Sequence, residues 1–282
     1  MPISTRLLSL SAAGLIVATA AQTASAEAVL APHRAIYVLS LETVGQGSRI
    51  TGADGEIVFE FEGSKCAGYT VNYRYRTEFF MSGNENRVSD FTASTFENGD
   101  HSAFNFSSTS ANNGEPDKQT DGEAKREDDA VDIKLVKPEE KKLVIKDPIT
   151  FPTEHLLLTL DAAARKQLIL KANLFEGSDS GEKASVTTTI IGKERSDKDA
   201  KAGADKDFPE LAELKRWRVT VSYFDKERST GETTPFYVSR FRLYENGISS
   251  DLVLDYKTFK LRGKLTKLEM LPVDSCAKGG GD

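Results

Sequence analysis

Hydrophobic and polar residues alternate along most of this chain, which is the pattern of half-buried β-strands. In residues 69–79, tyrosine, valine and phenylalanine fill most of one alternate set of positions, and polar or charged residues fill the other. Residues 57–62 and 217–223 show the same period of two. Antiparallel sheets with one buried face and one wet face have this alternation. The pattern therefore predicts a mainly β fold built from antiparallel strands.

Turn sequences separate the predicted strands. Asn-Gly pairs at 98–99 and 246–247 favour the positive φ angles of tight hairpin turns. Longer turns rich in Gly, Asp and Ser are predicted at 52–55 and 177–181. Residues 112–129 are rich in Asp, Glu, Lys and Gly, and they predict either a long exposed loop or a polar hairpin.

One segment has the period of a helix instead. Pro152 precedes Thr153, a candidate N-cap, and we expect a helix over residues 154–166. The apolar positions expected on one side of it are Leu157, Leu160, Ala164 and Leu168. Further apolar residues widen this surface, so the helix needs burial on more than one side. We therefore expect it to pack against the concave face of a single, highly curved sheet and to fill that face.

The first 26 residues have the features of a secretory signal peptide. Arg6 precedes a short apolar stretch, and Ala24-Ser25-Ala26 is a typical cleavage pattern. The mature chain is then expected to begin at Glu27 in the periplasm. No later segment reaches the roughly 18 apolar residues of a membrane-spanning helix, so a chain that does not span the membrane is predicted. Residues 27–282 are expected to form one domain with a flexible, charged insertion at 196–207.

Composition narrows the set of partners. The chain has 37 Lys and Arg against 43 Asp and Glu, which gives a net charge of −6. Because an acidic surface repels phosphate backbones, nucleic acid is not an expected partner. The hydrophobic content of 39% is enough to build a core, so global disorder is excluded.

The chain contains two cysteines, Cys66 and Cys276. In an oxidising compartment, an isolated pair is most simply a disulfide. The short Cys-x-x-Cys spacing of a redox-active pair is absent. We therefore predict a structural disulfide between Cys66 and Cys276.

The sequence contains no familiar catalytic motif. His33, His101 and His155 are too far apart in sequence for a metal-ligand motif, and the Walker, Gly-x-Ser-x-Gly and Gly-x-Gly-x-x-Gly patterns are absent. We expect no catalytic, cofactor or metal site, and hence no enzyme. His155 is expected to tie the helix to the sheet by a hydrogen bond. A hydrolase that uses two carboxylates stays open, because nothing marks one acidic pair among many.

Several segments together resemble the EipB family of periplasmic cell-envelope integrity proteins. The resemblance rests on their order and spacing and on the two cysteines. The segments are Leu30–Tyr37, Phe151–Leu156, Asp179–Lys183, Ile190–Lys193, Tyr244–Gly247 and Leu254–Tyr256.

That resemblance implies a spiral β-sheet wrapped around helical elements, with Cys66 and Cys276 forming a disulfide. It also implies an architecture similar to the lipoprotein carriers LolA and LolB, and a role in envelope integrity and stress resistance without enzymatic activity. The first hypothesis is that the chain binds a periplasmic or envelope protein partner. The alternative is a lipid or lipoprotein carrier that holds an acyl ligand on the concave face.

Overall fold

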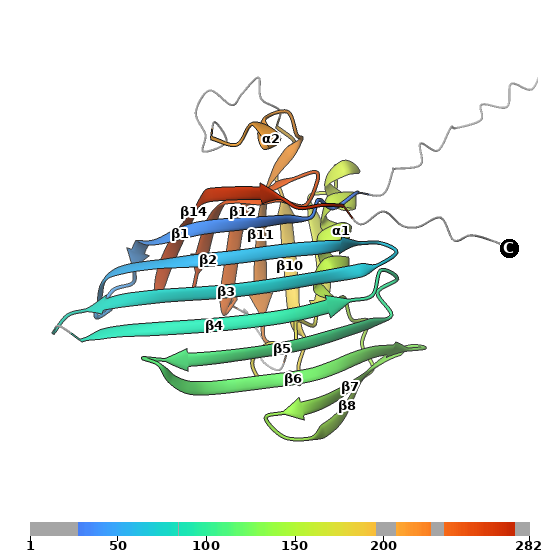
Figure 1. Ribbon diagram of the computed structural model, residues 1–282, viewed down its shortest axis with the longest axis horizontal. Coiled ribbons are helices and arrows are strands. Elements are labelled where there is room, and N and C mark those ends of the chain that lie inside the picture. The colour runs from blue at the N-terminus through green and yellow to red at the C-terminus, as the bar shows by residue number, and fades with distance from the viewer. Residues whose placement is uncertain (1–27, 84, 196–206, 227–233, 274–282) are drawn as a thin grey trace, which may run out of the picture.

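The computed structural model describes residues 28–83, 85–195, 207–226 and 234–273 (Figure 1). The predicted signal peptide, Glu27, Cys276 and nearly all of the predicted insertion at 196–207 lie outside these ranges. The limits of the mature chain, the insertion and the disulfide therefore stay predictions. None of the described helices is both long and apolar enough to cross a membrane.

The described residues form one 14-stranded antiparallel sheet. Its strands are β1 (His33–Val44), β2 (Ile50–Ser64), β3 (Gly68–Met81), β4 (Asn86–Glu97), β5 (Ala103–Asn112), β6 (Glu115–Glu127), β7 (Ala130–Lys137), β8 (Lys141–Ile145), β9 (Ile169–Leu174), β10 (Ser185–Ile191), β11 (Arg216–Phe224), β12 (Tyr237–Tyr244), β13 (Ser249–Asp255) and β14 (Phe259–Met270). Two helices accompany them, α1 (Pro152–Ala164) and the short α2 (Pro209–Ala212). The predicted mainly β fold is confirmed.

The sheet is curled but not closed. Its order runs from β8 down to β1 and then from β14 down to β9, and no ladder joins the edge strands β8 and β9. Phe61 and Tyr69 from one half nevertheless share a core cluster with Trp217 and Val219 from the other half. The two halves therefore face each other across an interior (Figure 1). The expected single, highly curved, open barrel-like sheet is confirmed.

Helix α1 packs inside the curled sheet, as predicted, and lies at one end of its interior. Leu160, Ala162 and Ala163 are buried between the two halves of the sheet. Two details of the prediction are wrong. Ala164 is exposed, and Leu168 lies beyond the helix with 60% of its surface exposed. The helix ends two residues earlier than expected, and the chain then turns through Lys166, whose φ is +60°, into β9.

The start of α1 also differs from the prediction. The N-cap is Phe151, with Pro152 as the first helical residue, and Thr153 is not the cap. The carboxylate of Glu97, at the end of β4, instead accepts hydrogen bonds from the backbone N–H groups of Thr153 (2.7 Å) and Glu154 (2.9 Å). A helix N-terminus offers unpaired N–H groups and a favourable dipole for such a carboxylate. This contact joins the helix to the β4–β5 hairpin.

The turn predictions are largely confirmed. The Asn-Gly pairs at 98–99 and 246–247 connect β4 to β5 and β12 to β13. Residues 112–129 form the turn after β5, strand β6 and the turn before β7, so the polar-hairpin alternative is correct. The turn predicted at 52–55 is wrong, since these residues lie inside β2. A Cβ at Gly55 would lie 2.4 Å from the carbonyl oxygen of Arg76, so this glycine permits a close strand approach.

Candidate functional site

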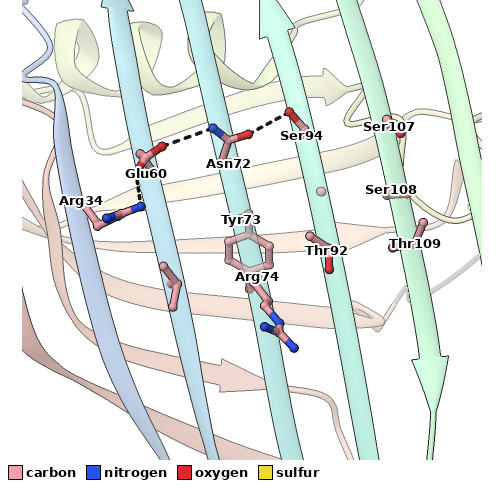
Figure 2. A pocket seen from close by; sticks show the side chains of 12 residues that line it. Arg34, Glu60, Asn72, Tyr73, Arg74, Thr92, Ser94, Ser107, Ser108 and Thr109 are labelled. Atoms are coloured by element: carbon pink, nitrogen blue, oxygen red, sulfur yellow. Dashed lines mark hydrogen bonds and ion pairs between the residues drawn. The ribbon is translucent and has the colours of Figure 1, made fainter. Parts of the chain in front are cut away.

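A polar groove lies on the outer face of the sheet across β1 to β5 (Figure 2). It has a volume of about 260 Å³. The strands alternate, so the side chains that point outward here are the polar set predicted from the sequence. Those that line the groove include Arg34, Glu60, Asn72, Arg74, Thr92, Ser94, Ser107 and Thr109.

A chain of polar contacts crosses four strands along one side of the groove, as Figure 2 shows. Arg34 forms an ion pair with Glu60 at 2.8 Å, and Asn72 donates a hydrogen bond to Glu60 at 3.4 Å. Ser94 donates in turn to Asn72 at 2.9 Å. These contacts link the four side chains in one row on the outer face of the sheet.

Arg74 is held by a second carboxylate. Its guanidinium donates two hydrogen bonds to Asp90, at 3.1 and 2.7 Å. The hydrogen bond from Arg74 is the main cause of the lowered pKa of Asp90. Bidentate pairs of this kind fix the plane of the guanidinium. Nearby Thr92 and Thr109 add hydroxyl groups, and the groove contains neither histidine nor cysteine. The groove is therefore lined mainly by charged, amide and hydroxyl side chains that can donate or accept hydrogen bonds.

A second hollow lies at the end of the barrel opposite α1. Its volume is about 550 Å³, within the range of small-molecule sites. The lining is mainly apolar, with Ile50, Phe79, Met81, Val88 and Phe259. Arg87 also lines it and forms no ion pair with another described residue. The concave face is therefore filled by the helix at one end only, which corrects the expectation that α1 fills it.

Glu176 lies in the interior, two residues after β9, and sequence reasoning did not single it out. Burial and, to a lesser extent, the charge of Asp179 raise the pKa of this carboxyl to about 7. Perturbed carboxyl groups of this kind mark candidate functional sites. The surrounding groups come from strands far apart in the sequence, so the only signal available beforehand was an acidic residue directly after the buried Phe175.

The three histidines have structural roles. His33 donates a hydrogen bond to the carbonyl oxygen of Ala31 at 2.7 Å. His101 pairs with Glu97 at 2.6 Å, and this hydrogen bond raises the pKa of His101. His155 lies 3.2 Å from the Thr189 hydroxyl, which confirms the predicted link between helix and sheet.

Burial lowers the pKa of His155 to about 4, so it is neutral at pH 7. Among the described residues, no group of three or more His, Cys, Asp or Glu side chains could hold a metal ion. A two-carboxylate hydrolase would need a carboxyl with a raised pKa, as Glu176 has, and a second positioned carboxylate. The acidic side chain whose charge helps to raise the pKa of Glu176 is Asp179, which is exposed and pairs with Lys118.

Fold and sites together define a barrel-like β protein with a polar outer groove and a mainly apolar hollow at one end. The chain belongs to the EipB-like family, which it matches over residues 24–272. It is 39% identical over 251 residues to the cell envelope integrity protein EipB of Brucella abortus (strain 2308), covering 89% of this chain and 88% of that protein.

A solved structure agrees with the fold. The crystal structure of a beta-barrel-like protein of the domain of unknown function DUF1849, also from Brucella abortus, aligns with a TM-score of 0.80 and 36% identity. The alignment covers 87% of this chain and all of that one. The family predicted from the order of short segments is thus confirmed.

Proposed function

We propose that this chain is a non-enzymatic periplasmic protein that supports cell-envelope integrity and stress resistance by binding a protein partner. The observation that carries the proposal is the 39% identity, over 89% of the chain, to a protein named for cell envelope integrity. The signal-peptide pattern in residues 1–26 supports the periplasmic location.

The outer groove supports the partner-binding part of the proposal. Protein interfaces commonly combine arginine anchors with many hydrogen bonds and bridging waters. Arg74 is oriented by Asp90, and the neighbouring Thr92 and Thr109 hydroxyl groups are available to a partner's backbone or side chains. The expected partner has a polar surface that complements the side chains lining the groove.

Deletion of the gene tests the role, and cross-linking tests the surface. A strain without the gene should become sensitive to detergent or β-lactam antibiotics. A photo-reactive residue at Thr109, in the groove, should cross-link one envelope protein, and the same residue at Arg218, on the exposed face of β11, should not. Unchanged resistance under every envelope stress would contradict the role. Equal cross-linking from both positions would contradict the groove.

The hollow at the open end favours a second candidate function, a lipid or lipoprotein carrier. Its apolar lining suits an acyl chain, and Arg87, which has no ion-pair partner in the described part of the chain, suits an anionic head group. Native mass spectrometry of protein isolated from the periplasm should then detect bound acyl ligand. Arg87→Ala should lose this ligand, and Arg76→Ala, on the outer face, should keep it. Protein that carries no acyl ligand would rule against a carrier.

A further inference from the structure

Five aromatic rings follow one another across the inner face at the open end. Tyr223, Tyr237, Tyr256, Phe259 and Phe79 lie with successive ring centroids 5.2, 5.0, 4.9 and 5.1 Å apart. The last two rings line the hollow of about 550 Å³. The row therefore leads from that hollow into the interior of the barrel.

Glu176 lies at the inner end of this row. Its charge contributes to raising the pKa of Tyr73, Tyr223 and Tyr237, which come from β3, β11 and β12. Three strands thus place phenol groups within electrostatic range of one carboxylate. Aromatic faces are electron-rich and attract cations.

The loop that carries Glu176 is fixed against the other half of the sheet. The next residue, Gly177, has a φ of +63°, and a Cβ there would lie 2.3 Å from the ring of Phe106. Thr120, on β6, donates a hydrogen bond of 2.6 Å to the carbonyl oxygen of Asp179. Glu176 is therefore held in place by its backbone rather than by contacts of its side chain.

The Glu176 carboxylate accepts no hydrogen bond and forms no ion pair within the described part of the chain. The cations near its loop are taken by other acids, since Lys118 pairs with Asp179 and Lys141 pairs with Glu182. A buried carboxylate without a partner is costly, and a cation would remove that cost. Residue Glu176 is partly rather than fully buried, which leaves part of it accessible to a ligand.

We propose that the interior binds a small organic cation, with its ammonium group between Glu176 and the rings of Tyr73, Tyr223 and Tyr237 and its apolar body along the aromatic row. The carboxylate supplies the opposite charge, and the rings supply cation–π attraction. A simple acyl chain would leave Glu176 unpaired, so the site distinguishes an alkylammonium ion from a neutral lipid tail. This inference does not depend on either proposed function.

Calorimetry on the full mature protein at pH 8 tests the site, with n-hexylammonium as the probe and n-hexanol as its neutral counterpart. Hexylammonium should bind the wild type at least tenfold more tightly than hexanol. Glu176→Gln, which removes the charge and keeps the shape, should weaken hexylammonium binding at least tenfold. Glu182→Gln is the matched control, because it makes the same change in the same loop and should leave binding unchanged.

The affinity should also rise from pH 6 to pH 8. Glu176 loses its proton over this range, whereas the facing tyrosines stay neutral because their pKa values are raised. Hexylammonium stays charged throughout. Equal affinity of Glu176→Gln and wild type, equal binding of hexanol and hexylammonium, or no wild-type binding at millimolar probe would each overturn the inference.

Discussion

The carboxylate of Glu97 accepts a hydrogen bond of 2.7 Å from the backbone N–H of Thr153, although 56 residues separate them. Glu97 is 1% exposed, and its second oxygen receives the N–H of Glu154 and the ring of His101. One carboxylate thus joins the end of β4, the following turn and the start of α1. The position of α1 at this end of the barrel therefore depends on Glu97.

Replacement of Glu97 by Ala should therefore lower the free energy of unfolding by about 2–3 kcal/mol, because a buried helix start loses its cap and His101 loses its partner. Chemical denaturation at pH 7 measures this. Glu85→Ala, which removes an exposed carboxylate, should change stability by no more than about 0.5 kcal/mol. Equal effects of the two substitutions would show that the cap contributes nothing.

Acid should destabilise the protein through His155. Its pKa is about 4 when folded and about 6.5 when unfolded, so only the unfolded chain takes up the proton between these values. Stability is therefore lost as the pH falls from 6.5 towards 4, at up to about 1.4 kcal/mol per pH unit. Melting temperatures at pH 7 and pH 5 should fall less for His155→Gln than for the wild type. The same fall in both proteins would exclude His155 as the cause.

Glu176 has the opposite pH dependence. Its pKa is about 7 in the folded state against a usual 4.5, so the folded chain holds the proton more tightly. Stability is therefore lost as the pH rises from 4.5 to 7. Glu176→Gln should increase the free energy of unfolding at pH 8 by about 2 kcal/mol and have little effect at pH 4. A variant that is less stable than the wild type at pH 8 would contradict this environment for Glu176.

The predicted disulfide makes its own prediction. Cys66 lies exposed in the turn between β2 and β3, where its sulfur is 3.3 Å from the Ser64 hydroxyl. If Cys66 and Cys276 are bonded, Cys66→Ser should lower the free energy of unfolding by up to about 5 kcal/mol. Reductant should lower the free energy of unfolding of the wild type by the same amount. Ser64→Ala is the control, with a small expected effect. A melting temperature that reductant leaves unchanged would mean that the thiols are not bonded.

Much of the fold could be predicted because strand alternation is a local signal. The apolar residues at alternate positions in 69–79 and 217–223 point inward, as their period of two requires. The hydrogen bonds from the start of α1 to Glu97 could not be predicted, because the carboxylate comes from a strand distant in sequence. The cap position itself belongs to Phe151 rather than to Thr153. Leu168 follows the helical period but falls after the helix has ended.

In the candidate sites, too, local features could be predicted and long-range contacts could not. The polar set that lines the outer groove follows from alternation, but its assembly across β1 to β5 depends on register, which the sequence alone does not give. In the sequence Glu176 cannot be told from other acidic residues, because the tyrosines that its charge influences come from three separate strands. Its chemistry is a property of the curled sheet rather than of its neighbours in sequence.

Complementation of a strain that lacks the gene tests most directly whether the outer groove supports the envelope. The variant Arg74→Glu/Thr92→Lys changes exposed or half-exposed side chains of the groove and should fold normally. At equal protein levels, wild type and an Arg218→Glu control should restore survival in detergent, and the groove variant should not. Full restoration by the groove variant would contradict the account.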